Sequence, residues 1–154
     1  MIACAEIFTE VLEVEPDDRM GTALPLFHVF GQAVVMGTSL RAGASLSLLE
    51  RFDAVALLDL LRRDKLTMMS GVPTMWNALL HAPAGPSDVE DFATLRLAAS
   101  GGAAMPAEVM NAFEQRFGCV ILEGYGLSET TGAATMAPRS RPARSARSTS
   151  RARS

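Results

Sequence analysis

The chain is 154 residues long, 49% of them hydrophobic, and carries a formal net charge of −3. That is enough apolar chain for one domain with a buried core. No run of about 18 apolar residues occurs, which excludes a membrane-spanning helix, and the acidic N-terminal region lacks the basic start of a signal peptide. The two cysteines, Cys4 and Cys119, have no metal-binding spacing, so we expect free thiols in a cytoplasmic protein.

Helical and extended patterns alternate along the chain. In order, they predict a helix over 4–15, a strand over 22–27, a helix over 28–43, a strand over 45–50, a helix over 52–65, a strand over 66–71, a helix over 73–82, a flexible loop over 83–91, a strand over 95–100, a helix over 106–118 and a strand over 119–125. In helix 52–65, Asp53 can cap the start, and Lys65 stands at the negative end of the dipole. The alternation predicts an α/β fold: a partial, largely parallel sheet with flanking helices.

The chain divides into two regions of opposite charge. Residues 1–136 hold all 17 acidic and eight basic residues, giving −9, whereas residues 137–154 hold six arginines and no acid, giving +6. The second region consists of Ala, Pro, Arg, Ser and one Thr, so it cannot build a core and we expect a disordered tail. A basic arm that binds nucleic acid is one interpretation. A shift of reading frame in a GC-rich gene is the interpretation that we favour.

Two glycine-rich segments, "ASGGAAMP" (99–106) and "GYGLSETTG" (124–132), each follow or end a predicted strand. Tyr125 offers a flat face for a base, Thr130 can donate its hydroxyl to phosphate oxygens, and Glu129 can hold a hard cation such as Mg²⁺. Ligands of open α/β sheets bind outside the carboxyl ends of the strands, so both segments stand where a site is expected. Glycine-rich turns with incidental hydroxyls remain the alternative.

Other single groups are ambiguous from their sequence context alone. His28 lies between apolar residues, where a lone histidine is usually a core or edge residue, and Trp76 has the context of a core residue. The sequence contains no Ser/His/Asp or Cys/His set suited to nucleophilic catalysis and no GxxxxGK[ST] phosphate loop.

Four blocks, taken together and in order, resemble one family. They are "LPLFHVFGQ", "GASLSLLERFDAVALLDLLRRDKLTMMSGVPTMWNALL", "LRLAASGGAAMP" and "ILEGYGLSETTG", of which "YGLSET" is the most specific motif. Residues 4–135 are similar to the middle of an adenylate-forming acyl-CoA synthetase, a fatty-acid–CoA ligase in particular. The resemblance implies that a carboxylate attacks the α-phosphate of ATP, and that the acyl-adenylate then passes its acyl group to coenzyme A. It also implies Mg²⁺ and hydroxyl donors that offset charge on the phosphate.

The resemblance assigns roles to the nucleotide side of the site. Tyr125 would stack on adenine, Thr130 would bind the α-phosphate, and Glu129 would serve the Mg²⁺. The backbone that lines the nucleotide would come from Gly101, Gly102, Ala103, Gly124 and Gly126.

On the acyl side, the resemblance places His28 near the substrate carboxylate and the thiol path. His28 is therefore a catalytic candidate together with Glu129 and Thr130. Val72 and Trp76 would border the acyl tunnel.

The resemblance also implies parts that are not in this sequence: a phosphate loop upstream, and a ribose-binding aspartate and a small C-terminal domain downstream. Residues 1–136 would then be an incomplete AMP-binding domain, an internal fragment of the large N-terminal domain. We expect no acyl-CoA formation by the isolated chain. Its partners would be a carboxylic acid, ATP and coenzyme A, with no nucleic acid.

Two alternatives stay open. An amino-acid-activating domain of a peptide synthetase usually has an aspartate near "PLFHVF" for the substrate amine, and this sequence has none there. A non-catalytic interaction module with a basic tail would lose its binding when residues 137–154 are deleted.

Overall fold

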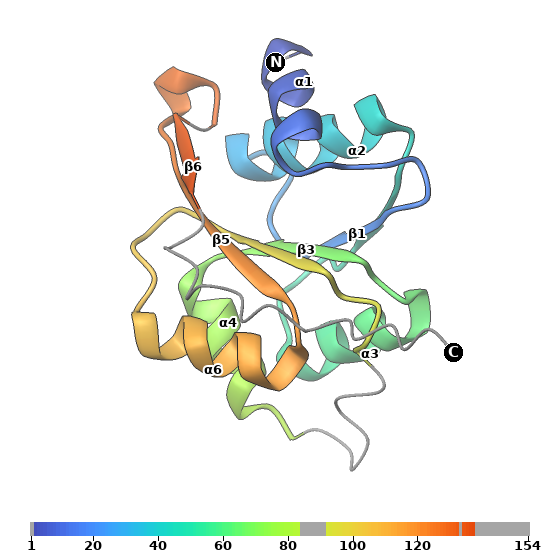
Figure 1. Cartoon of the computed structure of the whole chain (residues 1–154), viewed down its shortest axis with the longest axis vertical. Helices are drawn as coiled ribbons and strands as arrows, with labels where there is room; N and C mark the ends of the chain where they lie inside the picture. Colours follow the sequence, from blue (N-terminus) through green and yellow to red (C-terminus); the bar gives the residue numbers. More distant parts are fainter. Residues whose placement is uncertain (1, 84–91, 133, 138–154) are drawn as a thin grey trace, which may run out of the picture.

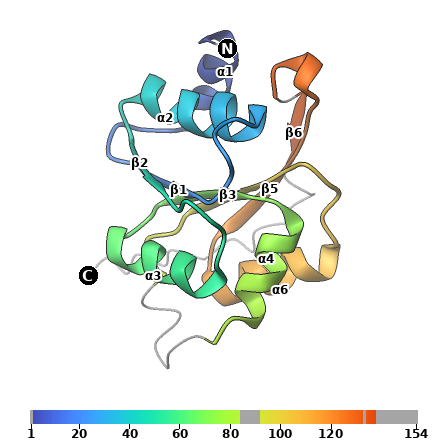
Figure 2. The ribbon, with the colours of Figure 1, turned by 180° about the vertical axis from the view of Figure 1, so that it is seen from behind.

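A computed structural model describes residues 2–83, 92–132 and 134–137. Helices cover both faces of one sheet: α1 and α2 lie over one face, and α3, α4 and α6 lie over the other (Figures 1 and 2). The strands are β1 (Arg19–Thr22), β2 (Ser45–Leu48), β3 (Met68–Gly71), β4 (Leu97–Ser100), β5 (Val120–Tyr125) and β6 (Thr135–Ala137). The helices are α1 (Ile2–Val11), η1 (Phe30–Met36, a π-helix), α2 (Gly37–Ala42), α3 (Ala54–Asp64), α4 (Pro73–His81), α6 (Ala107–Phe117) and η2 (Ser128–Thr130, a 3₁₀ turn). The predicted α/β fold is confirmed.

The sheet has six strands in the order β2-β1-β3-β4-β5-β6. The first five are parallel, so their carboxyl ends share one edge, and β6 alone runs antiparallel, pairing Tyr125 of β5 with Thr135. The sequence analysis did not predict β6. Ala137, which it assigned to the disordered tail, is the last residue of this strand. The rest of that tail, residues 138–154, lies outside the described residues, as do residues 84–91 of the predicted loop.

The first predicted strand was wrong, since β1 covers residues 19–22 rather than 22–27. The hydroxyl of Thr22 donates to the Ser70 carbonyl at 2.8 Å and accepts the Leu24 N–H at 3.0 Å. That second bond turns the chain out of the sheet, and Pro25 has no N–H with which to continue a ladder. The predicted helix over 28–43 forms as η1 and α2 joined end to end.

Aromatic side chains fill the layer between the sheet and α4 and α6. Trp76 of α4 is fully buried and meets Phe113 of α6 edge-on, with 5.1 Å between ring centroids. Phe113 stacks on Phe117 at 4.2 Å, and Phe117 lies against Phe92 at 5.0 Å. Large aromatic rings contribute the most buried area per side chain, so this cluster fixes the two helices against each other.

An ion pair and its hydrogen bonds join the amino-terminal starts of three strands. The Asp18 carboxylate, before β1, accepts bonds from Arg96, before β4, at 2.6 and 3.1 Å, and from the hydroxyl of Thr67, before β3, at 2.6 Å. Arg96 also donates to the Glu13 carbonyl at 2.8 Å. Burial alone would raise the pKa of Asp18, but the bonds from Arg96 and its other neighbours outweigh burial and hold that pKa below its ordinary value. We call this group the strand-start network; it lies at the opposite edge of the sheet from the carboxyl ends.

Among the residues that the structure describes, no helix has both the length and the apolar character needed to cross a membrane.

Candidate functional site

A cavity of about 280 Å³ opens at the carboxyl edge of the parallel strands. The turn after β4, the turn after β5 and the start of η1 converge on it. Six of the residues singled out in the sequence line it: His28, Gly101, Gly102, Gly124, Gly126 and Glu129. We call it the edge cavity. The expectation that both glycine-rich segments would meet at one edge of the sheet therefore agrees with the geometry.

Side chains would be accommodated poorly at three glycines of the edge cavity, either because of close neighbours or because of the backbone conformation. A Cβ on Gly101 would lie 3.2 Å from Cε1 of Phe30 and 3.3 Å from the Gly124 carbonyl oxygen. A Cβ on Gly124 would lie 3.2 Å from Cε of Met136. Gly102 has a φ of +82°, a conformation that costs other residues free energy. The wall is therefore bare backbone, whose N–H and C=O groups can face a flat ligand directly.

The ring of His28 has a defined tautomer when it is neutral. The Phe30 N–H donates to Nδ1 of His28 at 3.1 Å, so Nδ1 is an acceptor and the ring proton is on Nε2. The side chain is exposed at the mouth of the edge cavity. His28 can thus offer a hydrogen-bond donor, Nε2–H, to a carboxylate or phosphate oxygen.

The hydroxyl of Thr130 is engaged with the backbone of its own turn. It accepts the Leu127 N–H at 3.0 Å and lies 2.9 Å from the Leu127 carbonyl, to which it donates. To donate to a phosphate, it would have to give up the bond to that carbonyl. Glu129 next to it is exposed, lines the edge cavity and makes no ion pair or hydrogen bond within the described part of the chain.

The remaining predicted residues lie beside the edge cavity and do not line it. Tyr125 ends β5 with 62% of its surface exposed, and Ala103 is exposed in the turn after Gly102. Val72 lies behind the wall, its Cγ1 3.4 Å from the position of a Cβ on Gly102. Trp76 belongs to the aromatic core. The assignments of Val72 and Trp76 to an acyl tunnel stay predictions.

Five apolar lining residues were missed by the sequence analysis: Val29, Phe30, Val34, Leu127 and Met136. Phe30 and Val34 stand four residues apart in η1, just after His28, so their spacing could have marked a helix face that continues from the histidine. Met136 reaches the cavity only because β6 folds back on β5, and no sequence signal pointed to that strand.

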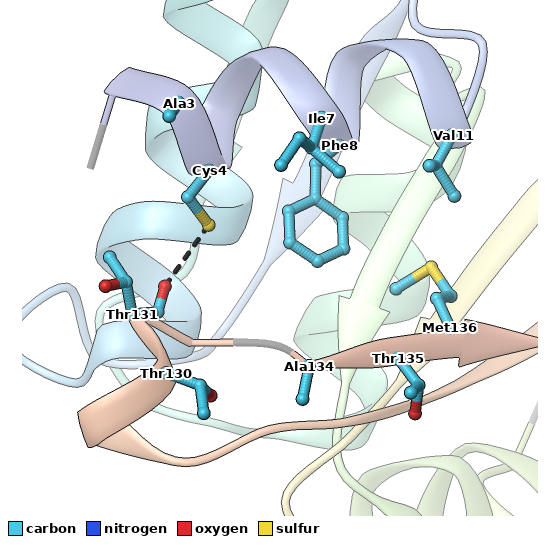
Figure 3. Close-up of a pocket in the computed structure, with 10 residues that line it drawn as sticks. All are labelled: Ala3, Cys4, Ile7, Phe8, Val11, Thr130, Thr131, Ala134, Thr135 and Met136. Carbon is cyan, nitrogen blue, oxygen red and sulfur yellow. Dashed lines mark hydrogen bonds between the residues drawn. The ribbon is translucent and has the colours of Figure 1, made fainter.

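A second hollow of about 390 Å³ lies between α1 and residues 130–136 (Figure 3). Its wall is mostly apolar, with Ile7, Phe8 and Val11 from α1. Here the Cys4 thiol donates to the Thr131 carbonyl at 3.2 Å, and burial raises the pKa of Cys4. Met136 lines both this hollow and the edge cavity. Glu129 lines the edge cavity and Thr130 lines this hollow, so the turn that carries them lies between the two.

A single carboxylate at the edge cavity limits how a metal can bind there. No group of three or more His, Cys, Asp or Glu side chains suited to a metal ion occurs within residues 2–83, 92–132 and 134–137. Mg²⁺ keeps several waters and is commonly held by one or two carboxylates together with substrate phosphates. The unpaired Glu129 therefore fits Mg²⁺ that arrives with a nucleotide, and does not fit a metal held by the protein alone.

Comparison with known proteins decides the family. The family model for AMP-binding enzymes matches residues 1–152. The chain belongs to the AMP-binding enzyme family. The chain is 38% identical over 108 residues to a long-chain-fatty-acid–CoA ligase of Bacillus subtilis (strain 168), and 33% identical over 108 residues to 4-coumarate–CoA ligase 1 of Oryza sativa subsp. japonica.

The structure of this family member is similar to that of ATP-bound MatB from Rhodopseudomonas palustris, with a TM-score of 0.78 and 31% identity. The match covers 88% of this chain and 26% of MatB. The two ligase matches each cover 70% of this chain and 19% of the relative. The chain thus spans about a fifth of the length of these curated relatives.

Proposed function

We propose that this chain carries part of the adenylate- and acyl-binding site of a cytoplasmic, ATP-dependent acid–thiol ligase that makes a fatty acyl-CoA. The observation that carries the proposal is the edge cavity, where bare glycine backbone, His28 and the unpaired Glu129 meet a wall of Phe30, Val34 and Met136. Similarity to CoA ligases and to an ATP-bound structure supports the same conclusion.

In the proposed reaction, the substrate carboxylate attacks the α-phosphate of ATP, and coenzyme A then takes the acyl group. Tyr125 stacks on adenine, while Gly101, Gly102 and Ala103 present backbone to the base and the acyl group. Thr130 exchanges its bond to the Leu127 carbonyl for one to the α-phosphate. When bound, Mg²⁺ supplies positive charge that offsets the charge of the phosphates.

On the acyl side, His28 offers Nε2–H to the carboxylate or the developing phosphate charge, and thereby orients the reacting oxygen. The preference for a fatty acid rests on the apolar side chains beside it. The side chains of Phe30, Val34 and Met136 offer an apolar surface to an alkyl chain, while the polar lining residues Ser100 and Ser128 stand on the glycine turns. Val72 and Trp76 would border the acyl group only beyond the glycine wall, since neither lines the edge cavity.

A titration of the 154-residue chain with AMP tests the proposal. We expect weak binding, with a Kd of about 1 mM or above, because only one wall of the site is offered. In an amide-resolved NMR titration, the largest shifts should fall on Gly101, Gly102, Gly124 and Gly126. Inorganic phosphate is the control and should shift fewer of these amides. The absence of shifts, or shifts at the strand-start network instead, would contradict the proposed site.

The variant Glu129→Gln separates metal from nucleotide binding. With Mg²⁺ present, ATP should bind about tenfold more weakly to the variant, because a neutral amide replaces the one carboxylate that faces the cavity. Without Mg²⁺, ATP affinity should not fall. Glu50→Gln makes the same charge change at an exposed carboxylate that does not line the cavity and is the matched control. Equal Mg²⁺-dependent affinity in the Glu129 and Glu50 variants would show that Glu129 holds no metal.

A further inference from the structure

Glu123 is a carboxylate in β5, a strand that is paired on both sides, where an apolar side chain would satisfy packing. It pairs in register with Ser100 of β4 on one side and with Ala137 of β6 on the other, and its side chain is half-buried. A half-buried carboxylate loses solvation and needs hydrogen-bond donors in return. Glu123 has one: its Oε1 accepts the Met105 N–H at 2.9 Å.

The turn that donates this hydrogen bond forms the glycine wall of the edge cavity. Residues 101–106 connect β4 to α6 without helix or strand structure. At the start of the turn, the Gly101 N–H donates to the Gly71 carbonyl at 3.2 Å, and at its end the Met105 N–H donates to Glu123. Met105 is itself buried, whereas Gly102 and Ala103 between the two bonds are exposed. The Glu123 carboxylate thus fixes one end of a segment whose middle faces solvent.

We propose that Glu123 is a positioning residue, which holds the turn from Gly101 to Met105 in place as the wall of the edge cavity. Its relevance to a ligand rests on the proposed function, because the ligand is the nucleotide or acyl group that this wall would face. A hydrogen bond from a backbone N–H to a carboxylate is stronger than one between neutral groups. Glu123 acts through the backbone of the turn and does not line the cavity itself.

The chain provides a matched control in Glu114. Its Oε1 accepts the Ile121 N–H at 2.9 Å, so it makes the same kind of bond at the same length. Ile121 lies near the beginning of β5, whereas the edge cavity lies at the end of that strand. Replacing Glu114 therefore removes an equivalent bond without touching the glycine wall.

The test uses the full chain as wild type and as three variants: Glu123→Ala, Glu123→Gln and Glu114→Ala. Amide hydrogen exchange at Met105 is the first readout, and AMP affinity is the second. In Glu123→Ala, the Met105 amide should exchange about tenfold faster or more, and the Kd for AMP should rise about tenfold. Glu123→Gln should restore both, because its amide oxygen can still accept the N–H. Glu114→Ala should lose comparable resistance to urea while leaving both readouts unchanged.

Two results would overturn the inference. One is an unchanged Met105 exchange rate in Glu123→Ala; the other is an equal loss of AMP affinity in Glu114→Ala, which would indicate general destabilisation. If the wild-type chain binds no AMP, the proposed function fails, and the exchange rates still decide whether Glu123 holds the turn.

Discussion

Trp76→Ala is expected to lower the free energy of unfolding by about 3–5 kcal/mol, the usual cost of emptying a large aromatic site in a core. Trp76 is fully buried and packs on the edge of Phe113. Its ring also lies close to the backbone of Gly71: a Cβ built on that glycine would lie 3.0 Å from Cζ2 of Trp76. With glycine on one side, the Gly71 backbone supplies no side chain that could fill part of the cavity. Urea unfolding followed by far-ultraviolet circular dichroism measures the loss, since the variant has no tryptophan fluorescence.

Two further variants show whether the loss comes from packing. The Trp76 Nε1–H has no hydrogen-bond partner in the described structure, so Trp76→Phe gives up no hydrogen bond and should cost much less than Trp76→Ala. Phe27→Ala removes an aromatic ring that is 90% exposed and should change the free energy of unfolding by no more than about 0.5 kcal/mol. A loss from Phe27→Ala as large as that from Trp76→Ala would argue against the aromatic cluster as the core.

Arg96→Met should cost about 2–3 kcal/mol near neutral pH, because it leaves the Asp18 carboxylate buried without its cation. The Asp18 side chain is only 7% exposed, whereas that of Arg96 is 40% exposed, which places the expected loss toward the low end for a broken buried pair. The thioether of methionine fills much of the arginine stem, so the loss reports the charge and hydrogen bonds more than the packing.

The effect of Arg96→Met should also depend on pH. In the wild type, the pKa of Asp18 is below its ordinary value of 3.8, so its contribution to stability is complete above that value and disappears as the pH falls through the lower, folded-state pKa. Without Arg96, burial acts with less opposition and raises the pKa of Asp18. The difference in stability between wild type and variant should therefore be constant from about pH 6 to 8 and shrink below about pH 4.

Urea unfolding at a series of pH values checks both statements about Arg96. Arg63→Met is the matched control: Arg63 also pairs with a carboxylate, that of Asp64, and that pair lowers the pKa of Asp64 to about 2. Arg63 is well exposed, so solvent replaces its interaction and the control should unfold almost as the wild type does. A loss from Arg96→Met that is the same at pH 3 and pH 7 would show that Asp18 is not the group responsible.

The fold could be predicted from the sequence wherever local pattern and tertiary context agree. Helix 52–65 has its cap and apolar face in the sequence, and α3 forms there with the Asp53 carboxylate accepting the Ala56 N–H at 2.8 Å. The apolar run 22–27 has the composition of a strand, but β1 ends at its first residue, because Thr22 and Pro25 end the ladder. The three-residue strand β6 is too short to leave a periodic signal, and its pairing with β5 is a tertiary effect.

The candidate site was predictable in its glycines and less so in its side chains. The rule that ligands bind at the carboxyl ends of parallel strands was enough to bring both glycine turns together. The sequence could not reveal that the hydroxyl of Thr130 is engaged with Leu127, because such a bond depends on the turn geometry. The spacing of Phe30 and Val34 could have placed them on one helix face, but it could not reveal that this face lies against the cavity, which depends on how η1 packs in the fold.

Met136 borders both hollows, and this has a consequence for the size of ligand that the chain accommodates. A methionine side chain is unbranched and moves between several low-energy rotamers. Its Cε lies 3.2 Å from the position of a Cβ on Gly124, so a rotamer directed toward α1 instead would pass space from the second hollow to the edge cavity. In the proposed site, the rotamer of this one side chain would then set the depth of the edge cavity without any movement of the backbone.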